Sequence, residues 1–151
     1  MSEDEKANLK LIVRNREDLK VISAYSQDSV VAIKDITFLK KNRIFVMLIN
    51  RFMWEYIESG INSQSKSKRI RCALKFEGIL KVKSKKVKQK NKNKRLECLA
   101  IECNEILSKN NEINFFFAGG GVITLISESI EAVMHDLGEP WNVRHTPKHK
   151  I

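Results

Sequence analysis

Three consecutive glycines, Gly119, Gly120 and Gly121, lie between the apolar runs FFFA and VITL. A glycine run of this kind can bind phosphate through backbone N–H groups, or it can form a tight turn between two strands. A phosphate-binding loop ends in Lys followed by Ser or Thr and leads into a helix. Here Val122 follows, and the next residues alternate with the period of two that is typical of a strand. The sequence therefore favours a hairpin turn, and we expect a partner or another backbone to pack closely against it.

The most basic part of the chain is residues 66–95, which hold 14 of the 28 Lys and Arg residues and one acid, Glu77. This region has a formal charge of +13, whereas the rest of the chain carries −3. Its densest part, residues 81–95, could bind nucleic-acid phosphates or form a solvated loop. No aromatic residue or histidine falls between Glu77 and Asn114 to stack on bases, so the solvated loop is favoured. The candidate phosphate contacts are Lys81, Lys83, Lys85, Lys86, Lys88, Lys90, Lys92 and Lys94.

Neither the cysteines nor the histidines have the spacing of a catalytic or metal site. Cys98 and Cys103 would point to opposite faces of one strand, so they are expected to be packed thiols. His145 and His149 are separated by Pro147 and cannot share a helical face. No G-x-S-x-G turn marks a serine nucleophile. The sequence therefore predicts no catalytic residue, no metal ligand and no cofactor, and an enzyme without a recognisable motif is an alternative.

The segment NRFMWE, residues 50–55, contains Arg and Trp, two residue types that often anchor protein interfaces. An exposed pair of Arg51 and Trp54 would form a partner contact. In the alternative interpretation, which the sequence favours, Phe52 and Trp54 pack at the end of a strand while Arg51 and Glu55 solvate that end.

The N-terminal half predicts the elements that would position these residues. The alternating stretch LKLIVRN, residues 9–15, predicts a strand. Asn15 is the expected N-cap of a helix that runs to about Gln27 and buries Leu19 and Ile22. Residues 29–52 are rich in β-branched and aromatic residues, with a turn at KKNR and a central strand at IFVMLI. A loop at about residues 58–68 follows, and then the strand RIRCALKFEGILKV, in which Gly78 predicts a bulge.

The C-terminal half predicts three further strands, in LECLAIECNEIL and on either side of the glycine run. The stretch SIEAVMHDLGEPW then predicts a helix. Ser129 is the expected N-cap, Val133 and Leu137 belong to an apolar stripe, Gly138 would end the helix, and Pro140 would prevent its continuation.

The predicted fold class is α+β, because most of the strands are joined by hairpins and helices lie only near the two ends of the chain. We expect an antiparallel, strongly bent sheet or half-barrel of about six to seven strands, with one helix near the N-terminus and one C-terminal helix. The leading architecture is pleckstrin-homology-like, with the C-terminal helix closing the half-barrel. A flatter sheet with both helices on one face is the alternative.

The 151 residues suit one domain, which we expect at residues 9–141, between a flexible tail at 1–8 and a second tail at 142–151. No apolar run approaches the ~20 residues of a membrane span. The polar N-terminus has no secretory signal, and Cys72, Cys98 and Cys103 make an odd count. A cytoplasmic protein with reduced thiols is therefore expected.

Several stretches together resemble an uncharacterised family of small bacterial proteins, known only as a domain of unknown function. They are LKLIVRNREDLKVISAYSQDSV, LINRFMWE, RIRCALKFEGILKV and FAGGGVITLISESIEAVMHDLGEPW, which cover nearly the whole chain. The most specific signature is FAGGG, IEA, DLG and Trp141. The chain departs from the family at Ser129, where members carry Cys, and in a longer, lysine-rich connection at 84–95. The resemblance implies a single bacterial cytoplasmic domain and carries no activity with it.

The sequence leads to three functional hypotheses. The first is a non-enzymatic binding or protein-interaction domain, acting on an unknown protein partner or by self-association. The second is a nucleic-acid-associated protein that uses the lysine-rich segment 81–95. The third is the enzyme without a recognisable motif. No membrane association is expected.

Overall fold

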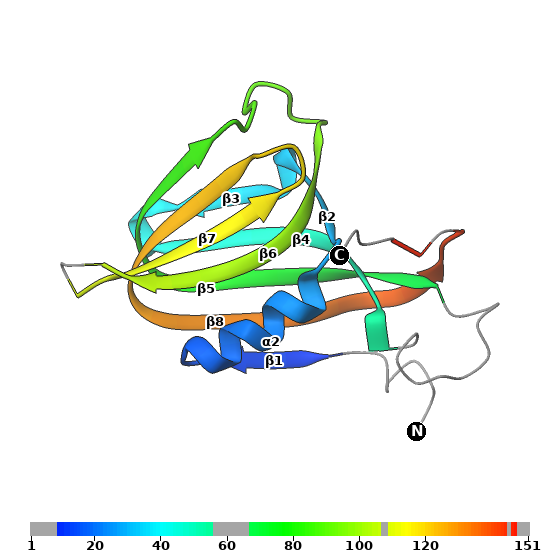
Figure 1. The fold of residues 1–151 in the computed structure, drawn as a ribbon, viewed down its shortest axis with the longest axis horizontal. Coiled ribbons are helices and arrows are strands. Elements are labelled where there is room, and N and C mark those ends of the chain that lie inside the picture. The colour runs from blue at the N-terminus through cyan, green and yellow to red at the C-terminus, as the bar shows by residue number, and fades with distance from the viewer. Residues whose placement is uncertain (1–8, 56–66, 107–108, 145, 148–151) are drawn as a thin grey trace.

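The computed structural model describes residues 9–55, 67–106, 109–144 and 146–147. They form an eight-stranded antiparallel sheet that is strongly curved, with a helix against its lower side in the view of Figure 1. The elements are β1 (Lys10–Val13), α2 (Arg16–Ser26), β2 (Val30–Ala32), η1 (Ile33–Asp35), β3 (Ile36–Leu39), η2 (Lys40–Asn42), β4 (Ile44–Phe52), β5 (Lys68–Lys85), β6 (Arg95–Glu105), β7 (Asn111–Phe117) and β8 (Val122–Asn142). The helices η1 and η2 are single 3₁₀ turns.

The strand order is β1-β8-β5-β4-β2-β6-β7, and β3 pairs with β4 outside this path. The two longest strands, β5 and β8, have 18 and 21 residues and pair with each other over most of their length. The first part of β8 also pairs with β7, so the sheet curls back on itself. It is a curved sheet rather than a closed barrel, because β2 and β4 meet at a single residue pair, Val30 and Asn50.

The concave side of the sheet holds the hydrophobic core. Its aromatic centre is formed by Phe45, Phe76 and Phe115, whose side chains are at most 1% exposed. The ring of Phe115 lies 5.4 Å from that of Phe76 and 5.9 Å from that of Phe45, between centroids. Burial of such rings accounts for a large share of the hydrophobic stabilisation of a domain this size.

The helix, the turn and the central strand predicted within residues 15–52 are confirmed. Asn15 caps α2 by accepting a hydrogen bond from the backbone N–H of Asp18 (2.8 Å), and Leu19 and Ile22 are buried. The KKNR turn is formed by η2 and by Arg43, which has a left-handed φ of 56°. The strand after it, β4, is central, since it pairs with β5 on one side and with β2 and β3 on the other.

The strand predictions in the C-terminal half are also confirmed, including the bulge at Gly78. The register between β5 and β8 shifts between Glu77 and Ile79, and Gly78 has a positive φ of 70°. A Cβ at residue 78 would lie 3.4 Å from Ser129 Oγ, so the positive φ rather than a lack of space favours glycine at this bulge.

The predicted C-terminal helix is wrong, because residues 129–141 belong to β8. The apolar residues of this segment fit both a helical period and a period of two. In the structure, buried and more exposed side chains alternate from residue 132 to residue 137. Strands β1 and β5 pair with the two edges of this part of β8, and these ladders satisfy its backbone hydrogen bonds.

The fold class α+β and the strongly bent antiparallel sheet are thus confirmed, with eight strands rather than six to seven. The pleckstrin-homology-like architecture is corrected together with the terminal helix that defined it. The predicted tail at 1–8 and most of the predicted loop at 58–68 lie outside the described residues. At the other end, the N–H of Val143 donates to the carbonyl of Ser67 (2.8 Å). None of the described helices has the length and apolar character needed to cross a membrane.

Candidate binding site

The lysine-rich connection between β5 and β6 is attached to the rest of the fold by its backbone. The N–H of Ile33 donates to the carbonyl of Lys94, and the N–H of Lys34 donates to that of Lys92, both at 3.0 Å. Val87 packs against the hydrophobic core. The connection is therefore docked on η1, although its lysine side chains are exposed.

The eight candidate phosphate contacts are all exposed and follow one another closely along the chain. They are Lys81, Lys83 and Lys85 on β5, then Lys86, Lys88, Lys90, Lys92 and Lys94 on the connection. Alternate residues of a strand face the same side, so the three lysines of β5 project together. None of the eight forms an ion pair with another described residue. Their charges therefore remain available to an anionic partner.

The glycine run forms the β7–β8 hairpin turn and lies against this connection. Gly119 and Gly120 have φ values of 86° and 90°, which side-chain-bearing residues rarely adopt. A Cβ at residue 121 would lie 3.4 Å from the carbonyl oxygen of Lys86, whereas one at residue 119 would meet nothing within 4 Å. The close approach of another backbone therefore occurs at Gly121, while Gly119 and Gly120 are exposed.

A cavity of about 280 Å³ opens between β3 and the lysine-rich connection. Seven of its lining residues are apolar, and four polar or basic residues come from β5 and the connection. The apolar residues are Ile33, Ile36, Phe38, Phe45, Val82, Val87 and Ile123, and the polar ones are Lys83, Ser84, Gln89 and Lys92. Gln89 Nε2 donates to Ser84 Oγ (2.7 Å), which fixes one side of the mouth.

Strand β3 borders this cavity and presents one free edge. Within the described residues β3 pairs with β4 alone, and its side chains Ile36 and Phe38 point into the cavity. A strand edge of this kind carries backbone donors and acceptors that can pair with an added strand. The sequence did not predict the cavity, because its lining comes from six elements: η1, β3, β4, β5, the connection and β8.

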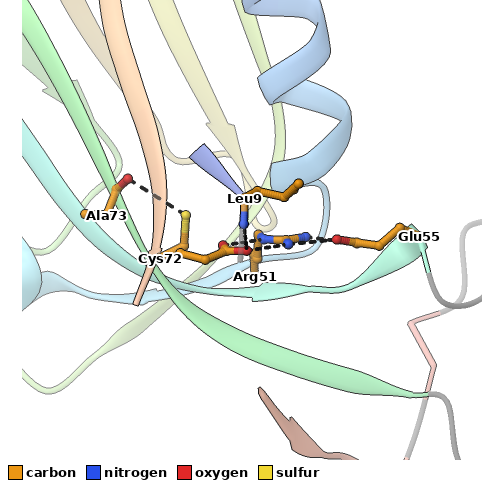
Figure 2. Close-up of polar contacts among 6 residues, drawn as sticks. Leu9, Arg51, Glu55, Cys72 and Ala73 are labelled. Atoms are coloured by element: carbon orange, nitrogen blue, oxygen red, sulfur yellow. Dashed lines mark hydrogen bonds and ion pairs between the residues drawn. The ribbon is translucent and has the colours of Figure 1, made fainter. Parts of the chain in front are cut away.

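Arg51 is a fully buried ion rather than a solvated strand end, as the favoured interpretation of the sequence had it. Its Nε and Nη2 donate to the two carboxylate oxygens of Asp136, both at 2.8 Å, and Nη1 and Nη2 donate to Glu55 at 3.0 and 2.8 Å (Figure 2). The ring centroid of Tyr25 lies 5.5 Å from the guanidinium carbon. The cation is thus held by two carboxylates and faces one aromatic ring of the same chain, and it is not exposed to solvent.

The Arg51 network also holds the start of β1. The backbone N–H of Leu9 donates to Asp136 Oδ2 (2.9 Å), and the N–H of Asp136 donates back to the carbonyl of Leu9 (2.9 Å). Burial acts to lower the pKa of Arg51, but the hydrogen bonds to Asp136 and Glu55 outweigh it and raise that pKa above its ordinary value. Arg51 therefore stays protonated and positively charged in the interior of the fold.

Trp54, the other candidate partner contact of this segment, is half-buried. Its indole N–H donates to the carbonyl of Gln27 (2.9 Å), and its ring packs edge-on against Phe52 with centroids 4.6 Å apart. Phe52 in turn lies 5.6 Å from the guanidinium carbon of Arg69. This cluster joins the end of β4 to the end of α2.

The three cysteines are free thiols with a low tendency to ionise. Burial raises the pKa of Cys98 to about 12, and burial is also the main cause that raises the pKa of Cys72 and of Cys103. A nucleophilic cysteine needs the opposite shift. The described residues contain no group of three or more His, Cys, Asp or Glu side chains that could hold a metal ion, and His145 and His149 lie outside them.

Fold and site together define a class: a strongly curved antiparallel α+β domain with an apolar cavity under a basic surface. The chain belongs to the family described as Protein of unknown function (DUF2948), which matches residues 9–149. The resemblance to an uncharacterised family is thereby confirmed over nearly the whole chain. No curated protein and no solved structure matches the chain significantly.

Proposed function

We propose that this protein is a non-enzymatic binding domain that takes an acidic, extended protein segment at the cavity beside β3. The observation that carries the proposal is the combination of an apolar cavity, a free strand edge and uncompensated lysines in one place. The segment would pair with the edge of β3, place an aliphatic side chain in the cavity and direct its carboxylates toward Lys83 and Lys92.

Charge complementarity favours an acidic partner. Residues 81–95 carry eight lysines and Arg95 and contain no acid. Basic surfaces raise the association rate of acidic partners and disfavour basic ones. Since these lysines form no internal ion pairs among the described residues, a partner's carboxylates do not have to displace existing contacts.

The size and chemistry of the cavity favour an aliphatic side chain as its occupant. An apolar cavity of about 150 Å³ already holds benzene in another protein, and this one measures about 280 Å³. Extended peptides that add a strand to a sheet gain affinity from backbone hydrogen bonds and specificity from side-chain pockets. Both requirements are met at β3, where Ile36 and Phe38 connect the strand edge to the cavity wall.

The test is direct binding of a labelled hexapeptide that alternates Glu with Ile, measured by fluorescence anisotropy. The matched peptide carries Gln in place of Glu. We expect the acidic peptide to bind more tightly. The double variant Lys83→Ser/Lys92→Ser should weaken its binding by about tenfold, since both lysines are exposed and each exposed ion pair is worth at most about 1 kcal/mol. The variant Ser84→Trp, which fills the mouth, should abolish binding of both peptides.

The matched control is Lys10→Ser/Arg14→Ser, which removes the same charge from the β1 region on the opposite side of the molecule (Figure 1). It should bind the acidic peptide like the unchanged protein. Equal affinity for the Glu and Gln peptides, or an unaffected Lys83→Ser/Lys92→Ser variant, would rule the proposal out.

A nucleic-acid partner is the second candidate, and the run of eight exposed lysines favours it. Binding of a single-stranded oligonucleotide would then depend on all these lysines and would fall steeply with salt. It would not depend on Ser84→Trp, because phosphates do not enter an apolar cavity. Oligonucleotide binding that survives this variant, together with no peptide binding, would replace the first proposal by the second.

The cytoplasm is the compartment that we propose for this domain. The free thiols Cys72, Cys98 and Cys103 support it, because unpaired cysteines suit a reducing environment.

A further inference from the structure

A second cavity of about 500 Å³ lies on the outer side of the sheet, where β2, β4 and β5 adjoin the end of the lysine-rich connection. Its lining is mostly polar, and three of its eight residues are basic. The residues are Val30, Ala32, Lys34, Asp35, Asn50, Arg71, Asn93 and Arg95. It is separate from the cavity beside β3, since the two share no lining residue.

Strand register brings the polar groups of this cavity together. Arg71 of β5 lies opposite Asn50 of β4, and Asn50 lies opposite Val30 of β2. Arg95 of β6 lies opposite Ala32 of β2. Because Val30 and Ala32 have short side chains, open space remains between the two arginines.

The guanidinium of Arg71 is held in a fixed orientation. Its Nη1 donates to Asn50 Oδ1 (3.2 Å), and its Nη2 lies 3.2 Å from Asp35 Oδ2. A guanidinium has five N–H donors, so donors remain beyond these two contacts. The side chain is 35% exposed, which leaves those donors accessible from solvent.

Asparagine amides add neutral donors to the same space. Because Asn50 accepts from Arg71 through Oδ1, its NH2 group is the part that is left for a ligand. Asn93 supplies a second amide from the connection. The backbone bonds of Lys34 to Lys92 and of Ile33 to Lys94 hold this part of the connection in place.

The balance of charge around the cavity is positive. Lys34, Arg71 and Arg95 face one carboxylate, Asp35, which is already paired with Arg71. Glu97 lies opposite Val30 on β6 but does not line the cavity. Planar arginines and amide donors around an open polar space match the geometry of a phosphate group.

We propose that this cavity binds the phosphate group of a small phosphorylated polar molecule, with Arg71 and Arg95 on the phosphate and the amides of Asn50 and Asn93 on the hydroxyl-bearing part. The volume exceeds what a phosphate ion alone would need. None of the lining residues is aromatic, so the cavity has no surface for stacking a base, and sugar phosphates fit it better than nucleotides.

The probe is ribose 5-phosphate, titrated into the isotope-labelled protein and followed by NMR signals of the Asn50 and Asn93 side-chain amides and of Arg71 Nε. We expect saturable shifts at these groups. Arg71→Gln and, separately, Arg95→Gln should each weaken binding by about tenfold or more, the loss typical of one charge-assisted contact. Arg71→Lys should restore part of the affinity, because it keeps the charge without the planar donors.

Two controls separate this proposal from others. Lys10→Gln removes one charge from β1, which β8 separates from Arg71 on β5, and it should leave ribose 5-phosphate binding unchanged. Lys83→Ser/Lys92→Ser should also leave ribose 5-phosphate binding unchanged. This variant therefore distinguishes a failure of the peptide-binding proposal from a failure of the phosphate-binding proposal. A circular dichroism spectrum and melting temperature establish that each variant is folded.

Three results would overturn the proposal. They are an absence of saturable shifts with ribose 5-phosphate at millimolar concentration, equally tight binding of inorganic phosphate, and shifts that are unaltered in both folded arginine variants. Arg71-dependent binding of a single-stranded oligonucleotide without ribose 5-phosphate binding would overturn it as well, and would assign the arginines to a nucleic-acid backbone.

Discussion

Arg51 and Asp136 show how much a single buried contact decides in this protein. Both side chains are 0% exposed, and they lie 85 residues apart in the chain. The desolvation of two buried charges is costly, and only good geometry with further hydrogen bonds offsets it. Here Glu55 accepts further hydrogen bonds from Arg51, and the N–H of Leu9 donates to Asp136. The pair therefore joins β4, β8 and the start of β1.

Removal of one partner from this pair should be strongly destabilising. We expect Asp136→Ala to lower the free energy of unfolding by about 3–5 kcal/mol, because Arg51 would remain buried with half of its carboxylate partners missing. Urea denaturation followed by tryptophan fluorescence measures the loss. The double variant Arg51→Met/Asp136→Leu should lose less than the single variant, since no buried charge is left uncompensated.

The control for this prediction is an ion pair of similar length at the surface. Arg43 Nη1 and Glu128 Oε1 are 2.9 Å apart, but the side chains are 56% and 51% exposed. Glu128→Ala should therefore cost at most about 1 kcal/mol. Comparable losses for Asp136→Ala and Glu128→Ala would show that burial does not govern the strength of the Arg51 pair.

Thiol reactivity provides a second test at the residue scale. With its pKa raised to about 12 by burial, Cys98 is about one part in ten thousand thiolate at pH 8. Cys72 is also buried with a raised pKa, whereas Cys103 is only half-buried. We expect iodoacetamide to modify Cys103 alone in the native protein, and the Cys103→Ser variant to react only after denaturation, as read by mass spectrometry. Rapid labelling of Cys72 or Cys98 in native buffer would contradict this assignment.

The raised pKa of Cys98 implies that the stability of the fold depends on pH. Unfolded thiols ionise near ~8.5, whereas Cys98 keeps its proton up to about 12 in the fold. Above the pKa of the unfolded thiol, the unfolded state binds fewer protons than the folded state. The free energy of unfolding therefore falls as pH rises from that pKa toward the pKa of Cys98 in the fold. Cys98→Ala should reduce the slope of this fall in urea titrations.

At the scale of the element, β8 is the segment in which local pattern and structure diverge. Ser129, the apolar stripe, Gly138 and Pro140 together predict a capped helix. The structure instead needs a strand there, because β1 would otherwise lack a partner and the first half of β5, which pairs with β4 on one side, would have an unpaired second edge. Ser127 Oγ donates to the carbonyl of Ser129, so these serines stabilise a bulge rather than a helix cap.

Gly138 has a positive φ of 73°, but it lies within a strand and does not end a helix as the sequence predicted. It lies where the β5–β8 register shifts, between the pairs of Arg71 with Leu137 and of Arg69 with Trp141. A Cβ there would meet nothing within 4 Å, so strain in the backbone is the only cost of a side chain. We expect Gly138→Ala to destabilise the fold by about 1–2 kcal/mol in urea denaturation.

The comparison for Gly138→Ala is Gly138→Asn, which should cost less because Asn tolerates the left-handed region. A stabilising Gly138→Ala substitution would contradict the left-handed backbone at this position. Backbone chemical shifts of residues 129–138 distinguish the strand from a helix without mutation.

At the scale of the whole molecule, the fold concentrates charge at one place. The end of β5 and the connection to β6 bring the lysines together, and residues 92–95 pass between two cavities. Lys92 lines the cavity beside β3, while Asn93 and Arg95 line the one beside β2. An acidic peptide and a small phosphorylated molecule can therefore be tested independently on one protein.

The sequence by itself determined the elements whose signals are local. The Asn15 cap, the KKNR turn, the bulge at Gly78 and the glycine hairpin depend on residues close in the chain, and the structure confirms them. Strand alternation likewise identified the bent antiparallel sheet, because a period of two is visible in a short window.

Tertiary structure alone decided the rest. Whether residues 129–138 form a helix or a strand depended on the unpaired edges of β1 and β5, which no local pattern records. The burial of Arg51 depended on Asp136, and the two cavities depended on side chains from strands that are distant in sequence. These features arise from long-range pairing, where backbone hydrogen bonds and buried charges have to be satisfied by whichever segment lies next to them in space.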